Sequence, residues 1–215
     1  VDPDHPADRI GYILDAADPI CVLTTSRDNF ASDRTVLLLD TLDAVALPRV
    51  LRVACFTPVT ATSEMRGLVP PDVQLLPQRG DDLGDRIRFA FDDLFAAGAR
   101  SVVLVGSDLP GIHAAAVSDA FALLRERGGA LVVGPARDGG YYLLGATRTP
   151  AVVLADMNWS APDVIEQTER RARDAGMEIH RVAPGGDIDT VEDLRALLES
   201  DAPAVRTRAA CRHDR

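Results

Sequence analysis

The chain has 215 residues, of which 47% are hydrophobic and 26% charged, so its size and composition fit a soluble globular protein of one domain. It can bury about 70% of its unfolded surface, so its folding needs no disulfide or structural metal. The net charge of −10 argues against nucleic acid or an anionic membrane as a partner, and the apolar runs are too short to cross a bilayer.

Short apolar runs alternate with longer amphipathic runs along the chain, a pattern that predicts strands alternating with helices. The predicted strands cover residues 20–25, 51–57, 72–77, 101–106, 130–134 and 141–145, with a weaker candidate at 178–182. The predicted helices cover residues 32–47, 83–98, 113–128, 160–176 and 190–200. Because this alternation requires crossover connections, the predicted fold class is α/β, with a Rossmann-like, mostly parallel sheet and helices on both faces.

The periodic pattern indicates a single domain over residues 1–200. Residues 201–215 lose the apolar periodicity, and we expect them to form a mobile C-terminal tail. No basic-then-apolar leader opens the chain, which favours a cytoplasmic location. No heptad pattern or exposed apolar stripe stands out, so the sequence leaves the oligomeric state open.

The residue types restrict the possible chemistry. All 23 basic residues are arginine, which excludes a Walker-type phosphate loop and a lysine Schiff base. The three cysteines show no metal-binding spacing, and Cys21 and Cys55 lie in apolar runs typical of buried thiols. The four histidines include no pair at i, i+4, which argues against a zinc site.

An acidic residue follows the most apolar predicted strand. In "SVVLVGSDLPGI", Asp108 comes after Gly106 and before Pro110, where the strand must end. Ligands of open α/β sheets bind at the carboxyl ends of strands, which makes Asp108 a candidate site residue. Capping of the following helix or local backbone hydrogen bonds would account for Asp108 equally well.

Two further motifs place carboxylates where they could join Asp108. Asp138 stands beside two glycines in "PARDGGYYLLG", and Asp187 and Asp189 are spaced i, i+2 in "PGGDIDTVEDL". If residues 187–189 are extended, both of their carboxylates point to the same side. Together with Asp108 they could give three oxygen ligands to Mg²⁺ or Mn²⁺. Capping of the next helix would account for one of the pair, but not both.

Five ordered motifs give the chain a family resemblance. They are "LLPQRGDDLGDRIRFAF", "VVLVGSDLPGI", "VGPARDGGYYLLG", "NWSAPDVIEQT" and "GGDIDTVEDL". Over about residues 36–198 the chain resembles small bacterial nucleotide-diphospho-sugar-transferase-like proteins, which have the glycosyltransferase-A fold and are related to phospholactate guanylyltransferases and molybdenum-cofactor nucleotidyltransferases. The resemblance implies that Asp108, Asp187 and Asp189 are ligands of Mg²⁺ or Mn²⁺.

The resemblance also assigns the remaining motifs to substrates. It implies that the "QRGDDLG" segment forms part of a nucleotide pocket, with Gln78, Arg79, Gly80, Leu83, Gly84 and Arg86 as nucleotide-binding residues, to which Arg27 and Arg34 could add positive charge. It implies that "DGGYY" is an acceptor or sugar loop, with Asp138, Gly139, Gly140, Tyr141 and Trp159 as acceptor-binding residues. Asp108 and Asp138 are then the candidate catalytic residues.

The glycines and aromatic residues of these motifs could act on a ligand or simply stabilise the fold. The glycines could bring backbone N–H groups against a ligand, and Tyr141 could stack on a ring or belong to the core. Tyr142 faces the other way along the strand, and we expect it in the core. Trp159 could be a packing anchor as well as a platform for a ring.

The chain departs from the resembled family near its start. Relatives open with a strand, a glycine-containing loop and a Lys-Thr-Arg cluster that grips phosphates, whereas this chain has no glycine between residues 12 and 66 and no lysine. We therefore favour a metal-dependent glycosyltransferase that uses a nucleotide-sugar and a small-molecule acceptor. The alternatives are a nucleotidylyltransferase that joins a nucleoside monophosphate to a phosphorylated small molecule, and a non-catalytic nucleotide-binding relative.

Overall fold

The structure is a computed structural model that describes residues 20–24, 32–186, 191–202 and 204–213. Its centre is a seven-stranded sheet of order β3-β2-β1-β4-β6-β5-β7. The strands are β1 (Ile20–Thr24), β2 (Leu51–Phe56), β3 (Gln74–Pro77), β4 (Val102–Gly106), β5 (Leu131–Pro135), β6 (Tyr141–Ala146) and β7 (Ile179–Arg181). Strand β6 is antiparallel to its neighbours β4 and β5, and the other pairs are parallel, as the alternating pattern predicts.

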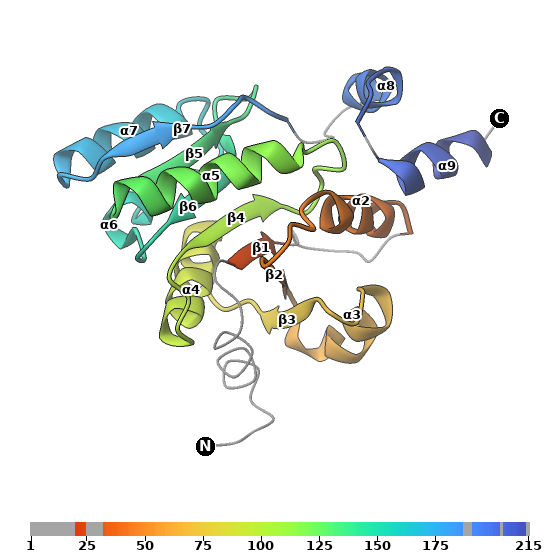
Figure 1. Ribbon diagram of the computed structural model, residues 1–215, viewed down its shortest axis with the longest axis horizontal. Coiled ribbons are helices and arrows are strands. Elements are labelled where there is room, and N and C mark those ends of the chain that lie inside the picture. The colour runs from red at the N-terminus through yellow and green to blue at the C-terminus, as the bar shows by residue number, and fades with distance from the viewer. Residues whose placement is uncertain (1–19, 25–31, 187–190, 203, 214–215) are drawn as a thin grey trace.

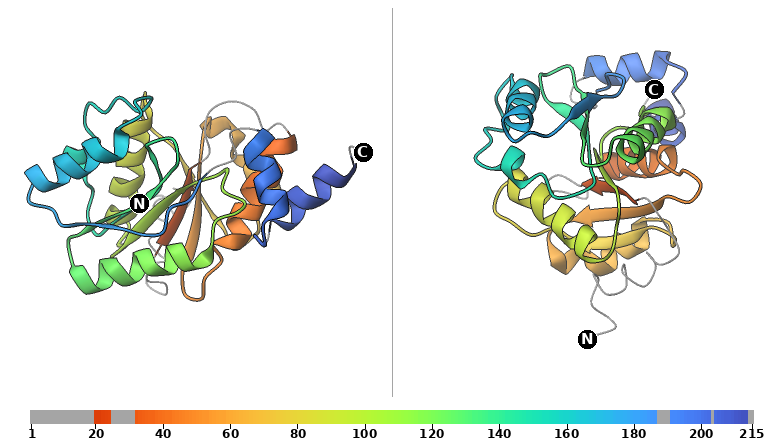
Figure 2. Two further views of the ribbon diagram at one scale, coloured as in Figure 1. Left: turned by 90° about the horizontal axis from the view of Figure 1, so that it is seen from above. Right: turned by 60° about the vertical axis from the view of Figure 1, so that its left-hand side comes forward.

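Helices cover both faces of this sheet. They are α2 (Ser32–Ala44), α3 (Thr62–Leu68), α4 (Leu83–Ala96), α5 (Ala114–Arg127), α6 (Ala151–Leu154), α7 (Val164–Asp174), α8 (Val191–Glu199) and α9 (Val205–His213), with a 3-10 turn at Val59–Ala61. Helices α2, α3 and α5 pack on one face, and α4, α6 and α7 on the other (Figures 1 and 2). The α/β architecture expected from the sequence is confirmed.

Strand β4 shows why its sequence is apolar throughout. Its side chains alternate between the two faces, so that Val103 and Val105 pack in the core below α2 and α5 while Val102 and Leu104 pack in the core below α4. All four are buried, as expected of a strand covered by helices on both sides. Strand β4 ends at Gly106, and the segment that follows it carries Asp108.

The C-terminal segment differs from the sequence prediction. Where a mobile tail is expected over residues 201–215, the structure has helix α9, which contacts α2 (Figure 1). The buried carboxylate of Asp40 in α2 accepts hydrogen bonds from the backbone N–H of Thr207 at 2.7 Å and of Arg206 at 3.0 Å, and from the Thr207 hydroxyl at 2.8 Å. Asp40 therefore satisfies N–H groups in the first turn of α9.

Three short or late helices have no counterpart among the predicted elements, and one predicted helix starts four residues too early. Helices α3 and α6 have only seven and four residues, too few for the apolar periodicity to show. The helix predicted over 160–176 begins at Val164, because the chain first makes a turn in which the N–H of Ala161 donates to the carbonyl of Asn158 at 3.1 Å.

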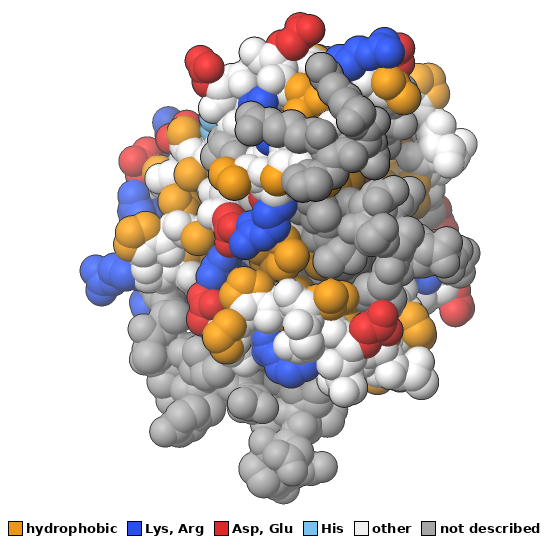
Figure 3. Space-filling view, turned by 90° about the vertical axis from the view of Figure 1, so that its right-hand side faces the viewer, with side chains coloured by type: hydrophobic (Ala, Val, Ile, Leu, Met, Phe, Trp, Pro, Cys, Tyr) orange, Lys and Arg blue, Asp and Glu red, His pale blue; other side chains and the backbone are white. Residues whose placement is uncertain are grey.

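Cys55 is buried in β2, as its apolar surroundings predict. Burial raises the pKa of its thiol, and the negative charge of Asp93 raises it further. Within the part of the chain that the structure describes, no helix has both the length and the apolarity to span a membrane. On the face shown in Figure 3, acidic and basic side chains are interspersed with hydrophobic ones.

Candidate functional site

The order of the strands locates the region where a ligand would bind. From β1 the chain continues outward through β2 and β3, then returns to place β4 on the other side of β1. This reversal is a topological switch point, and in open α/β sheets ligands bind beside it, at the carboxyl ends of the strands. Asp108 follows the carboxyl end of β4 and therefore lies at this position.

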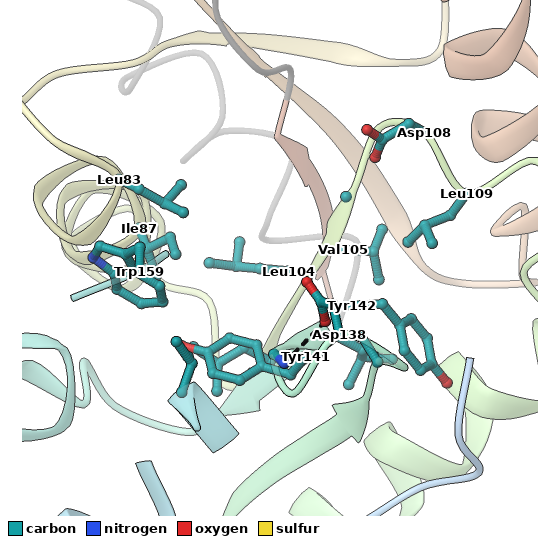
Figure 4. Close-up of a pocket in the computed structure, with 16 residues that line it drawn as sticks. Leu83, Ile87, Leu104, Val105, Asp108, Leu109, Asp138, Tyr141, Tyr142 and Trp159 are labelled. Atoms are coloured by element: carbon teal, nitrogen blue, oxygen red, sulfur yellow. Dashed lines mark hydrogen bonds between the residues drawn. The ribbon is translucent and has the colours of Figure 1, made fainter. Parts of the chain in front are cut away.

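A pocket of about 230 Å³ opens at the same edge of the sheet. It is lined by the ends of β4 and β6, the first turns of α4, the loop 136–140 and Trp159. Figure 4 shows Leu83, Ile87 and Trp159 on one side of it and Asp108 and Asp138 on the other, with Leu104 between them. The structure thus brings two carboxylates that are distant in the chain to the rim of one pocket.

Asp108 is held by interactions on both sides of it in the chain. The buried Thr41 hydroxyl of α2 accepts a hydrogen bond from the N–H of Leu109 and lies within donor distance of the carbonyl of Ser107, both at 3.1 Å. A Cβ atom at Gly106 would lie 3.0 Å from Asp108 Oδ1, so the glycine leaves room for the carboxylate. Sequence reasoning missed Thr41, because nothing near it in the chain indicates a partner 66 residues away.

The loop that carries Asp138 is fixed in a similar way. Asp138 Oδ1 accepts a hydrogen bond from the N–H of Gly140 at 2.9 Å, drawn as a dashed line in Figure 4. Gly139 has φ +90°, and a Cβ atom there would lie 1.7 Å from the carbonyl oxygen of Pro162. The carbonyl of Gly139 accepts from the N–H of Ile165 at 2.9 Å. Gly139 therefore joins the loop to the start of α7, and the N–H of Gly140 orients Asp138.

The two neighbouring tyrosines have different roles. Tyr141 presents its ring to the pocket and meets the Trp159 ring edge-on, with 6.1 Å between centroids. Its hydroxyl is buried next to that of Thr168, and burial raises its pKa. Tyr142 is buried, as predicted; its hydroxyl donates to the carbonyl of Ala183 at 2.8 Å, and burial raises its pKa to about 12. The pocket therefore receives aromatic surface from Tyr141, not an ionisable hydroxyl.

In the expected nucleotide-binding segment, Arg79 and Arg86 interact with neighbouring parts of the chain. Arg79 forms an ion pair with Asp93 and lies over the Phe89 ring, 4.5 Å from its centroid. Gly80 has φ +107°, which a turn at this point requires. The Nε of Arg86 donates to the carbonyl of Gly80 at 3.4 Å. These contacts stabilise the turn before α4.

Two more of these residues, Gly84 and Gln78, are packed into the fold and do not line the pocket. Gly84 is buried, and a Cβ atom there would lie 3.0 Å from Trp159 Nε1. The backbone N–H of Gln78 donates to the carbonyl of Phe56 at 2.7 Å, and its side-chain Oε1 is buried. Of the segment assigned to nucleotide binding, Leu83 lines the pocket, together with Ile87, which the sequence did not single out.

Four predicted site residues lie wholly or partly outside the described part of the chain. Arg27, Asp187 and Asp189 lie outside the described residues, and Arg34 belongs to α2 with its side chain outside the described part. Among the described residues, no three His, Cys, Asp or Glu side chains are grouped to hold a metal ion. The three-carboxylate metal site therefore stays a prediction, with Asp108 placed at the expected edge of the sheet.

Residues 41–161 match the model of a family described as "Uncharacterized protein conserved in bacteria" (DUF2064). This matched part contains Asp108, Asp138, Tyr141 and Trp159. A comparison with curated proteins gives no match.

Solved structures share the fold at low sequence identity. A "putative nucleotide-diphospho-sugar transferase" from Desulfovibrio desulfuricans G20 has a TM-score of 0.78 at 24% identity, covering 90% of this chain and 95% of its own. The CMP:2-keto-3-deoxy-manno-octonic acid synthetase complexed with CTP has a TM-score of 0.57 at 14% identity, covering 91% and 99%. Rv0371c of Mycobacterium tuberculosis H37Rv in complex with manganese has a TM-score of 0.50 at 18% identity, covering 86% and 100%.

Proposed function

The chain belongs to the DUF2064 family of bacterial proteins, and from this premise we propose that it is a metal-dependent glycosyltransferase that uses a nucleotide-sugar donor and a small-molecule acceptor. One observation carries the proposal: Asp108, beside the topological switch point, and Asp138, on a separate loop, border the same pocket. The fold shared with the D. desulfuricans protein, which is described as a "putative nucleotide-diphospho-sugar transferase", supports it.

Asp108 is proposed to hold Mg²⁺ or Mn²⁺ together with Asp187 and Asp189. Carboxylate oxygens are suitable donors for either ion, and the structure of Rv0371c in complex with manganese shows that a protein of this fold can be obtained with that metal. When bound, such an ion offsets charge on the diphosphate of the donor and of the leaving group. Arg27, Arg34 and Arg86 stay candidates for additional positive charge near the phosphates.

Asp138 is proposed as the base on the acceptor side. The hydroxyl oxygen of the acceptor forms a bond with the anomeric carbon of the sugar, and the bond from that carbon to the diphosphate oxygen breaks. Its electron pair leaves with the nucleoside diphosphate, while the hydroxyl proton passes to the carboxylate of Asp138. The N–H of Gly140 keeps that carboxylate in one orientation, which this role requires.

Nucleotidyl transfer is the second candidate. It is favoured by the fold shared with a synthetase that was solved in complex with CTP. In this reaction a phosphate oxygen of the acceptor would form a bond with the α-phosphorus of a nucleoside triphosphate, and pyrophosphate would leave. Asp108 would have the same metal-binding role in both reactions, so the products distinguish them.

The test compares Asp108→Asn with Asp119→Asn, a matched control on the exposed side of α5. We expect the native protein and the control to release nucleoside diphosphate from one member of a nucleotide-sugar panel when Mn²⁺ is present. Asp108→Asn should lose about 100-fold in rate and bind Mn²⁺ with nucleoside diphosphate more weakly in calorimetry. Undiminished metal-dependent binding by Asp108→Asn would refute the proposed role of Asp108.

The same assay separates the remaining candidates. Pyrophosphate release from a nucleoside triphosphate, with no turnover of nucleotide-sugars, would replace glycosyl by nucleotidyl transfer. Thermal stabilisation by nucleotides without turnover of either substrate class would indicate the non-catalytic relative.

A further inference from the structure

We propose that the pocket beside Asp138 binds the acceptor through a ring of about six members that is uncharged or cationic and carries a hydroxyl or amino group. Phosphate and carboxylate groups are thereby excluded as the part of the acceptor that lies beside Asp138. That the occupant is an acceptor rests on the proposed function, whereas its charge and shape are inferred from the side chains that line the pocket.

The charged side chains of the pocket limit the charge of its occupant. Asp108 and Asp138 are the charged side chains among the described residues that line it, and none of these lining residues is basic. Because Asp108 is the proposed metal ligand, the charge that an acceptor meets is that of Asp138. An anionic group beside Asp138 would face this carboxylate in surroundings that are partly apolar, where repulsion is stronger than in water. A neutral group avoids this repulsion, and a cationic group is attracted.

Two arginines of the neighbouring segments, Arg79 and Arg137, do not change this conclusion. Arg79 is engaged by Asp93 on the outer side of α4. Arg137, next to Asp138 in the chain, is 81% exposed and has its guanidinium 3.9 Å from a carboxylate oxygen of Asp193. Neither residue lines the pocket, so neither provides the cation that an anionic occupant would need.

The volume and the lining side chains of the pocket limit the size and shape of its occupant. An apolar cavity of about 150 Å³ can hold benzene, so a volume of about 230 Å³ leaves room for a six-membered ring with a short substituent. The rings of Trp159 and Tyr141 stand nearly perpendicular, at 81°, and so offer two differently oriented aromatic surfaces to the occupant. Leu104 and Ile87 add aliphatic surface. Such walls favour a flat or chair-shaped apolar body.

The arrangement of these walls orients the occupant. Trp159 lies on one side of the pocket and Asp138 on the other, with Leu104 between them (Figure 4). A ring packed against Trp159 and Leu104 therefore directs a polar substituent toward Asp138. The carboxylate of Asp138 can accept a hydrogen bond from a hydroxyl or an ammonium group, but not from a deprotonated phosphate or carboxylate.

The chain provides its own reporter for this pocket, because Trp159 is the only tryptophan. We would titrate the full chain with benzyl alcohol, benzylamine, benzoate and benzyl phosphate, four probes with one ring and different charge, and follow tryptophan fluorescence. Benzyl alcohol and benzylamine should change the emission at concentrations at least about tenfold lower than benzoate and benzyl phosphate. This comparison uses the native protein and does not depend on the folding of a variant.

Two variants test whether the carboxylate of Asp138 causes the discrimination between anionic and non-anionic probes. Asp138→Asn should bring the affinities for benzoate and benzyl alcohol closer together, because it removes the negative charge beside which the substituent lies. Asp174→Asn, at the far end of α7, is the matched control and should leave the discrimination unchanged.

The results separate this inference from the proposed function. Benzoate or benzyl phosphate binding as tightly as benzyl alcohol, or no response to any of the four probes, would overturn the inference. Glycosyl transfer to an acceptor whose phosphate lies beside Asp138 would also overturn it while supporting the proposed function. The expected discrimination without any glycosyl transfer would leave the pocket assignment standing and remove the transferase.

Discussion

Replacement of Gly139 by alanine tests how the Asp138 loop is fixed to the rest of the protein. Two costs follow from the structure. At φ +90° an alanine is strained by about 1–2 kcal/mol. In addition, its Cβ atom would lie 1.7 Å from the carbonyl oxygen of Pro162, so the loop or the start of α7 must move, at a further cost of about 1–3 kcal/mol.

Gly98→Ala is the matched control for this change. Gly98 follows α4 at φ +103°, so an alanine there has a similar backbone strain, but nothing lies within 4 Å of the added Cβ atom. We therefore expect Gly98→Ala to lower the free energy of unfolding by about 1–2 kcal/mol and Gly139→Ala by about 2–5 kcal/mol. The difference between them isolates the contact with Pro162.

Urea denaturation followed by circular dichroism and by Trp159 fluorescence measures both changes. Since Trp159 lies in the pocket, its emission also reports a loop that moves without global unfolding. Equal losses in the two variants, with unchanged native emission of Gly139→Ala, would refute the idea that the close approach of Gly139 to Pro162 joins the loop to α7.

Three other changes test separate parts of the structure. Gly106→Ala should crowd the carboxylate of Asp108 and lower Mn²⁺-dependent turnover by about tenfold, with the free energy of unfolding changed by less than about 1 kcal/mol; turnover at the native level would contradict the crowding. Asp40→Ala should lower the free energy of unfolding by about 2–4 kcal/mol in urea denaturation, because it removes the buried hydrogen bonds to Thr207, and Thr207→Val made in the Asp40→Ala background should cost little more. The pKa of Tyr142 is raised from 10.0 to about 12, so the folded state keeps its proton more firmly and stability should fall as the pH rises from about 10 to 12; in Tyr142→Phe this fall, measured by urea denaturation across that range, should be shallower.

The sequence predicted the fold well where a local pattern fixes the structure. Strand β4 has apolar residues at every position because both of its faces are covered, and this cause acts on each residue separately. The same reasoning failed for α9. Its position depends on the contact between Asp40 and Thr207, which are 167 residues apart, and no pattern in residues 205–213 contains that information.

In the candidate site, too, some features depend on a local sequence pattern and others on contacts between distant residues. Asp108 could be predicted because the end of a buried parallel strand is a position that the sequence itself reveals. Arg79 was assigned to nucleotide binding by its place in the "QRGDDLG" segment, and this role stays a prediction. The structure adds an ion pair between Arg79 and Asp93, which lies beyond that segment in α4. An arginine near a turn has the same appearance in the sequence whether its partner is a ligand or a carboxylate of the next helix.

The residues that give the pocket its apolar walls were the hardest to recognise. Leu104 and Ile87 read as core residues in the sequence, and they do pack in the core below α4. They line the pocket because α4 begins beside the carboxyl end of β4, although both side chains are buried. Charged motifs therefore indicated where chemistry could occur, whereas the shape of the occupant that we propose depends on apolar side chains whose place in the pocket is decided by packing between distant segments.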